Sequence, residues 1–140
     1  PINDMGREQV INVWMSEQGP DWRLDLRESN MDLAILTAYQ LARNWRGRVN
    51  LCMAVQDAET AEKAQQFLQE LISLARLTRQ TEAVVLERPF FDALTSAPQA
   101  DLNIFGLPHQ PDLKFVQQIV QQVDTSCIFV RDSGEESALA

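Results

Sequence analysis

Residues 106–111, GLPHQP, form the stretch whose residue types come nearest to a ligand site. The stretch contains His109, the single histidine of the chain, and it follows a run that is typical of a β-strand. Open α/β sheets bind ligands at the carboxyl ends of their strands, beside the start of a helix. Two prolines remove backbone donors here, however, and Gly106 alone does not build a phosphate-binding nest. The sequence therefore favours a structural turn, with ligand binding as the alternative.

The turn after the first predicted strand, SEQGP at residues 16–20, is the other place where a nucleotide would be expected. Nucleotide folds carry glycines there because glycine lets backbone amides close on a phosphate at a helix N-terminus. Neither GxGxxG nor GxxxxGK followed by Ser or Thr occurs among the five glycines. If the chain nevertheless bound a nucleotide, Ser16, Gly106 and His109 would be the expected contacts.

Catalytic and metal chemistry find little support in the side chains. A single histidine excludes a site with several histidine ligands, and no GxSxG motif is present. The carboxylates lie mostly at predicted helix starts, loops and strand ends, where they cap helices and complement helix dipoles. An enzyme that uses Asp101 and His109 is therefore the least favoured hypothesis, and we expect no catalytic residue, metal site or cofactor.

The two cysteines, Cys52 and Cys127, each lie in an apolar run that favours a strand, and they do not form a CxxC pair. Free cysteine is among the most buried residue types. We therefore expect both to be reduced thiols in the core.

Composition excludes several classes of protein. The chain has 140 residues, 45% of them hydrophobic, which suits one folded domain with a continuous core. Its formal net charge of −8 makes nucleic acid an unfavourable partner. No apolar run approaches the roughly 20 residues that cross a bilayer, and residues 1–7 do not resemble a signal peptide. We expect a soluble piece of a longer protein, because the chain lacks an initiator Met and enters a strand almost at once.

The spacing of apolar residues predicts alternating strands and helices. Such βαβ units have right-handed crossovers and give a doubly wound, mostly parallel sheet of five strands flanked by helices. We expect a single α/β domain over 1–132 and a flexible tail over 133–140. The predicted strands are 9–16, 48–55, 82–87, 101–107 and 125–131, and the predicted helices are 29–45, 57–77, 89–98 and one starting at 111.

Residues 22–27 alternate apolar and charged side chains, which is typical of a half-exposed edge element. Trp22 lies on this element, where it covers the core or meets a partner chain, and the first is favoured. Because identical domains commonly pair about a two-fold axis, we expect a homodimer, with Trp22 or Phe90 as candidate contacts.

Three stretches resemble the cytosolic C-terminal domain of the cation-chloride cotransporters. Residues 100–108, ADLNIFGLP, resemble that family's Ala-Asp-Leu, four residues, Leu-Pro stretch. Residues 11–15, INVWM, resemble its Ile-Asp-x-Trp-Trp strand, and residues 128–131, IFVR, its Leu-Leu-Val-Arg ending. The chain departs from the family at Asn12, Met15 and residues 19–22, which indicates a distant, prokaryotic relative.

This resemblance implies a universal-stress-protein-like fold attached to a membrane transporter for chloride with potassium, sodium or both. It also implies a non-catalytic regulatory and dimerisation domain on the cytoplasmic side of the membrane, whose partner is the transmembrane part. Stress proteins that bind ATP carry a Gly-x-x-Gly, nine residues, Gly-Ser or Gly-Thr loop after the fourth strand, and residues 106–119 lack it. The alternative that remains is a free stress-protein-like sensor of a small ligand or nucleotide.

Overall fold

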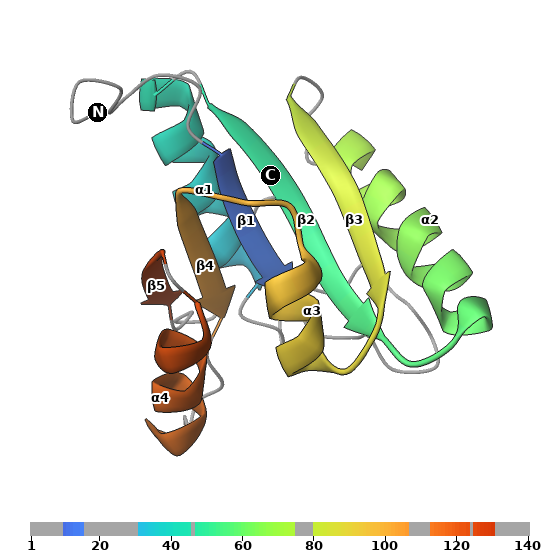
Figure 1. The fold of residues 1–140 in the computed structure, drawn as a ribbon. Coiled ribbons are helices and arrows are strands. Elements are labelled where there is room, and N and C mark those ends of the chain that lie inside the picture. The colour runs from blue at the N-terminus through green and yellow to red at the C-terminus, as the bar shows by residue number, and fades with distance from the viewer. Residues whose placement is uncertain are drawn as a thin grey trace.

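A computed structural model describes residues 10–15, 31–45, 47–74, 80–106, 113–123 and 125–130. Strands and helices alternate along the whole described chain, as Figure 1 shows. The elements are β1 (Val10–Met15), α1 (Met31–Trp45), β2 (Arg48–Val55), α2 (Ala58–Leu74), β3 (Thr81–Glu87), α3 (Phe90–Ser96), β4 (Leu102–Gly106), α4 (Leu113–Gln122) and β5 (Ser126–Val130).

The five strands form one sheet in the order β3-β2-β1-β4-β5, and all four neighbouring pairs are parallel. The chain first moves outward from β1 to β3 and then returns to the other side of β1 for β4 and β5. The doubly wound α/β fold that the sequence predicts is therefore confirmed. Predicted bounds agree with the strands to within one or two residues, whereas the tail over 133–140 lies outside the described residues.

Alternate residues along each strand enter two separate cores, because successive side chains of a strand point to opposite faces. One core packs the sheet against α1 and α2 and includes Ile11, Val13, Leu51 and Ile104. The other core packs the opposite face against α3 and α4 and includes Trp14, Cys52, Phe105 and Ile119. The helices thus cover both faces of the sheet (Figure 1).

Local signals set the starts of two helices. The carboxylate of Asp57 accepts a 2.7 Å hydrogen bond from the Thr60 amide and so caps the N-terminus of α2. Pro89 has φ −55° and stands just before α3, and its fixed φ suits the entry to a helix. Only two residues separate each helix from the strand before it, α2 from β2 and α3 from β3.

Candidate functional site

A cavity of about 330 Å³ lies at the carboxyl ends of β1, β2 and β4, on the face that α3 and α4 cover. In a doubly wound sheet the strand order reverses at one point, and the crevice outside the strand ends there is the usual ligand position. Here the reversal falls between β1 and β4, which contribute Trp14, Met15, Phe105 and Gly106 to the lining. Topology alone therefore places the cavity where ligands bind in this class of fold.

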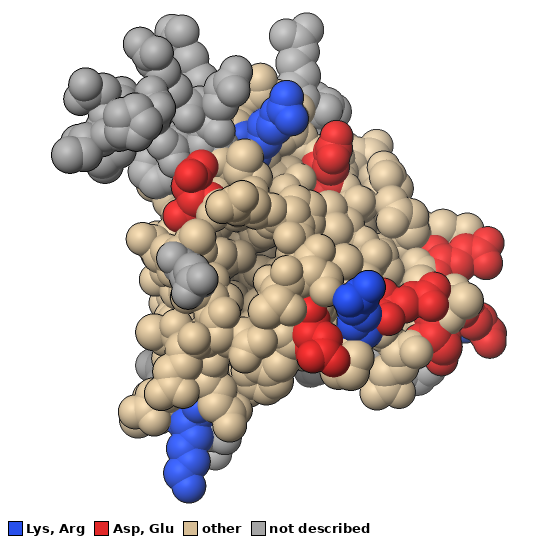
Figure 2. Space-filling view, in the orientation of Figure 1, with Lys and Arg blue, Asp and Glu red and all other residues tan. Residues whose placement is uncertain are grey.

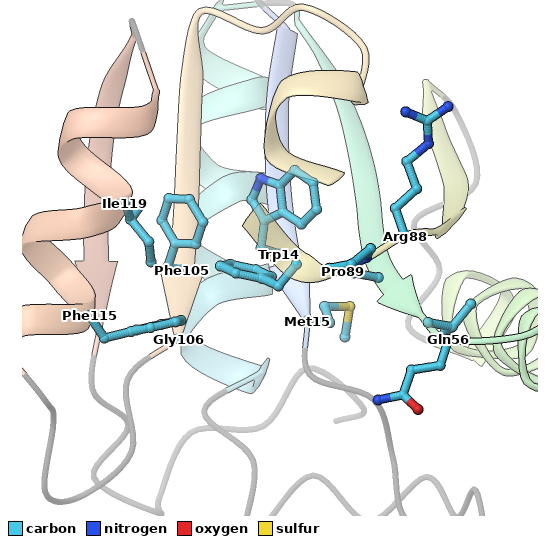
Figure 3. A pocket seen from close by; sticks show the side chains of 12 residues that line it. Trp14, Met15, Gln56, Arg88, Pro89, Phe105, Gly106, Phe115 and Ile119 are labelled. Carbon is cyan, nitrogen blue, oxygen red and sulfur yellow. The ribbon is translucent and has the colours of Figure 1, made fainter. Parts of the chain in front are cut away.

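Four aromatic rings form part of the cavity wall. The Trp14 and Phe105 rings stack with centroids 6.3 Å apart, and Phe90 meets Trp14 edge to face at 5.8 Å. Phe90 also stacks on Phe115 of α4 at 5.5 Å. Figure 3 shows Trp14 and Phe105 beside each other, with Phe115 on the side of α4. Ring pairs with this geometry add about 0.5–1.5 kcal/mol each beyond their buried area, so these contacts help to stabilise the wall.

The orientation of Trp14 is fixed by a buried hydrogen bond. Its indole Nε1 donates to Oδ1 of Asn103 over 2.9 Å, and Asn103 Nδ2 donates to Oγ1 of Thr125 over 2.7 Å. Trp14 is only 5% exposed, so an unpaired indole N–H would be costly there. The bond therefore holds the indole in one position against the cavity.

Asn103 belongs to a row of three asparagines that crosses the centre of the sheet. Asn50, Asn12 and Asn103 occupy paired positions on β2, β1 and β4, and each is less than 10% exposed. Asn50 Nδ2 donates to Asn12 Oδ1 over 2.9 Å, and Asn12 Nδ2 donates to the carbonyl oxygen of Pro98 over 2.9 Å. The Asn50–Asn12 bond thus links β2 to β1, the Asn12–Pro98 bond links β1 to the segment before β4, and the Trp14–Asn103 bond links β1 to β4.

The polar groups at the cavity edge are few. Gln56 and Arg88 line it from the ends of β2 and β3, but Arg88 extends away from the rings (Figure 3) and donates to Ser96 Oγ over 2.8 Å. The described lining includes no Ser, Cys, His, Asp or Glu. The lining therefore suits a flat or apolar group. Among these residues there is no side chain of the kinds that usually act as a general acid, a general base or a nucleophile.

Comparison with known proteins identifies the family. The profile described as "Prokaryotic cation-chloride cotransporter, C-terminal domain, 2nd" matches residues 6–139. The chain belongs to this family. A solved structure described as the cytoplasmic domain of a prokaryotic cation chloride cotransporter is 36% identical to this cotransporter domain, with a TM-score of 0.81. It covers 94% of this chain, whereas this chain spans 49% of that one.

A second solved structure shares the fold of this cotransporter domain. It is described as a universal stress protein in complex with cAMP, and it is 17% identical to this chain with a TM-score of 0.53. The aligned region spans 89% of this chain and 99% of the stress protein. At this identity the likeness shows the fold alone, which confirms the predicted stress-protein-like architecture. No curated protein sequence matches the cotransporter domain.

The structure describes two of the five predicted site residues. Gly106 ends β4 and lines the cavity, whereas Phe90 begins α3 and lies half-buried among the rings. Ser16, His109 and Trp22 lie outside the described residues, so their roles stay predictions. Asp101, the other residue of the least favoured enzyme hypothesis, precedes β4 at the opposite end of the strand from the cavity. Its Oδ2 accepts a hydrogen bond from the Val10 amide over 2.9 Å.

The cavity wall and the asparagine row were not foreseen. Phe115 and Gln56 come from different elements, and both line the cavity because of how α4 and β2 are placed around the reversal point. The asparagines did leave a signal, because each interrupts an apolar strand at a matching position. An amide at the same position in three neighbouring strands indicates buried hydrogen bonds between strands.

The two cysteines differ in burial. Cys52 is 0% exposed, and burial raises the pKa of its thiol to about 12. Cys127 is half-buried in β5, where burial also raises its pKa. Neither forms a disulfide, and only Cys52 is completely within the core, so the prediction of a core position holds fully for Cys52 alone.

Among the described residues, no group of His, Cys, Asp and Glu has the arrangement of a metal site. The helices in the described ranges are all too short or too polar to cross a bilayer.

Proposed function

We propose that this chain is a non-catalytic regulatory and assembly domain on the cytoplasmic side of a membrane cation-chloride cotransporter. The observation that carries the proposal is the family match over residues 6–139, supported by 36% identity to the cytoplasmic domain of a prokaryotic relative. In this role the domain docks on the transmembrane part of the transporter, forms a homodimer and passes conformational signals. The ions cross through the transmembrane part.

The construction of the domain suits this role. Two separate cores lie on the two faces of one parallel sheet, and the buried asparagine row ties its three central strands together. Such a body resists internal rearrangement, since close-packed cores transmit displacement instead of absorbing it. It can therefore move as one unit against a membrane-embedded partner.

A test uses the full transporter reconstituted in liposomes, with and without residues 1–140. We expect deletion to lower chloride-dependent cation flux per transporter and to shift the detergent-solubilised protein from dimer toward monomer. The exposed substitution Asn44→Ala on α1 is the matched control and should leave both measurements unchanged. Unchanged flux and unchanged oligomeric state after deletion would contradict the proposal.

The second candidate is a stress-protein-like sensor of a small ligand or nucleotide, and the cavity at the reversal point favours it. A ligand at about 100 times its dissociation constant stabilises the folded state by about 2.7 kcal/mol. For a domain of this size that corresponds to a rise in Tm of roughly 8 °C or more.

Thermal unfolding with millimolar ATP or cAMP tests this candidate. The sensor hypothesis predicts a rise that Phe115→Ala reduces, because this ring forms one wall of the cavity. Leu36→Ala, at a residue of α1 that is 37% exposed and does not line the cavity, is the control. No rise with either nucleotide would exclude nucleotide sensing and leave the assembly role as the sole proposal.

A further inference from the structure

The cavity at the carboxyl ends of β1, β2 and β4 is poorly suited to a phosphate group. Among the described residues that line it, Arg88 is the one charged side chain, and it extends away from the rings and donates to Ser96 Oγ over 2.8 Å. Figure 2 shows the described Lys and Arg side chains standing singly on this face of the molecule, without a basic patch. Phosphate sites are usually built from backbone amides at a helix N-terminus or from Arg and Lys side chains. The described lining therefore attracts a phosphate only weakly.

The N-terminus of α2, beside the cavity edge, already holds a negative charge. Gln56 lines the cavity, and Asp57 follows it directly at the start of the helix. Asp57 accepts the hydrogen bond from the Thr60 amide over 2.7 Å, and this bond lowers the pKa of its carboxyl. The ionised carboxylate takes the position on this helix end that a phosphate would need, and it repels other anions. An uncharged ligand avoids this repulsion.

The aromatic rings of the cavity suit a flat ligand. Trp14 and Phe105 lie nearly parallel, with an angle of 8° between their planes, and Phe90 and Phe115 form a second stacked pair at 27°. Phe115 lines the cavity and is 39% exposed, so part of its surface remains free for a ligand. Nucleobases and similar heterocycles stack on such side chains through their π-faces. The volume of about 330 Å³ lies at the lower end of the roughly 300–1,000 Å³ of ligand sites, which suits a small ring compound.

Gln56 supplies a neutral hydrogen-bonding group at the cavity edge. The indole N–H of Trp14 already donates to Asn103, so it is not available to a ligand. The side chain of Gln56 is exposed, and its amide can both donate and accept. The ring nitrogens and the amino or carbonyl groups of an uncharged heterocycle match such an amide. Few polar groups beside an apolar wall are the usual composition of a small-molecule site.

We infer that the cavity binds a flat, uncharged heteroaromatic compound of about the size of a nucleobase or nucleoside. Its ring stacks on Phe115, and its edge forms hydrogen bonds with the Gln56 amide. This inference rests on the sensor candidate and narrows the ligand of that sensor to compounds without phosphate. It does not depend on the assembly role.

Methyl NMR of the chain, with adenosine, AMP and N-methylindole as probes, tests the inference. Adenosine and N-methylindole should produce saturable shifts of the Ile119 and Met15 methyl signals, since both residues line the cavity. AMP should bind at least about tenfold more weakly than adenosine, or about 1.4 kcal/mol. Phe115→Ala should weaken both uncharged probes at least about fivefold, through lost stacking. Gln56→Leu should weaken adenosine alone, because N-methylindole has no hydrogen-bond donor.

Val120→Ala is the matched control, because Val120 lies on the same helix as Phe115, is 52% exposed and does not line the cavity. It should leave all three affinities unchanged. No shift with millimolar adenosine or N-methylindole would overturn the inference. AMP bound as tightly as adenosine would overturn the ligand class and keep the sensor candidate. Shifts that Phe115→Ala and Gln56→Leu leave unchanged would overturn the cavity as the site, and the deletion experiment tests the assembly role separately.

Discussion

Replacement of Asn12 by alanine removes the centre of the asparagine row and should destabilise the domain strongly. Asn12 is 2% exposed and accepts the 2.9 Å hydrogen bond from Asn50 Nδ2. Without Asn12 the Asn50 amide, in a residue that is 8% exposed, has no acceptor at that position. A buried donor left unpaired costs about 1–3 kcal/mol.

The second bond of Asn12, to the Pro98 carbonyl, adds less. Pro98 is exposed, so water replaces the lost donor and about 0.5–1 kcal/mol is expected from this loss. With the small void that alanine leaves, the total comes to about 2–4 kcal/mol. That is a large share of the roughly 5–15 kcal/mol by which a domain is usually stable.

Urea unfolding followed by circular dichroism measures the change. The double variant Asn12→Ala with Asn50→Ala should be less destabilised than the sum of the single variants by about 1–2 kcal/mol, because it leaves no unpaired amide between them. Asn44→Ala on the exposed surface of α1 is the control and should change the free energy of unfolding by less than about 0.5 kcal/mol. Additive single changes, or a loss below about 0.5 kcal/mol for Asn12→Ala, would refute this reasoning.

Three further predictions concern other parts of the fold. In native protein at pH 8 a thiol reagent should modify Cys127 but leave Cys52 unmodified until unfolding, because burial raises the pKa of Cys52 to about 12; equal rates would contradict this. The hydrogen bond from the Thr60 amide lowers the pKa of Asp57, so the stability that Asp57 contributes is present above its unfolded pKa and is lost as the pH falls through the folded pKa. Asp57→Ala should therefore lower Tm at pH 7 but hardly at all at pH 2, and a pH-independent difference would exclude the cap as the cause. Leu68→Ala, at a position with 0% exposure, should cost about 2–5 kcal/mol of unfolding free energy by urea titration, and a cost under about 1 kcal/mol would show that α2 packs loosely.

Much of the architecture follows from local pattern. The strand over 48–55 is predicted with the bounds that the structure shows, and Val49, Leu51 and Met53 enter one core while Cys52 enters the other. Successive side chains of a strand point to opposite faces, so the sequence predicts which residues share a face without reference to the neighbouring strands. Proline before α3 and aspartate before α2 act in the same way, through the backbone of their own turn.

The candidate site depended on contacts between distant segments. Gly106 was predicted from its place after a strand, whereas Phe115 and Gln56 join it through a fold that brings the ends of three strands and the start of α4 together. Phe90 was proposed as a surface contact, yet four aromatic rings surround it, from Trp14 to Phe115, and it lies half-buried. Its role at an interface stays a prediction, whereas its place in the cavity wall was visible only in the tertiary structure.

The sequence by itself determined the alternating elements, the parallel doubly wound class and the family resemblance, because hydrophobic spacing and short motifs are carried by neighbouring residues. Only the tertiary structure decided that Asn50, Asn12 and Asn103 align and that the aromatic rings lie around one cavity. Strand order and register set these features. They depend on the summed packing of residues that lie up to about 90 positions apart, such as Trp14 and Asn103, which local spacing does not encode.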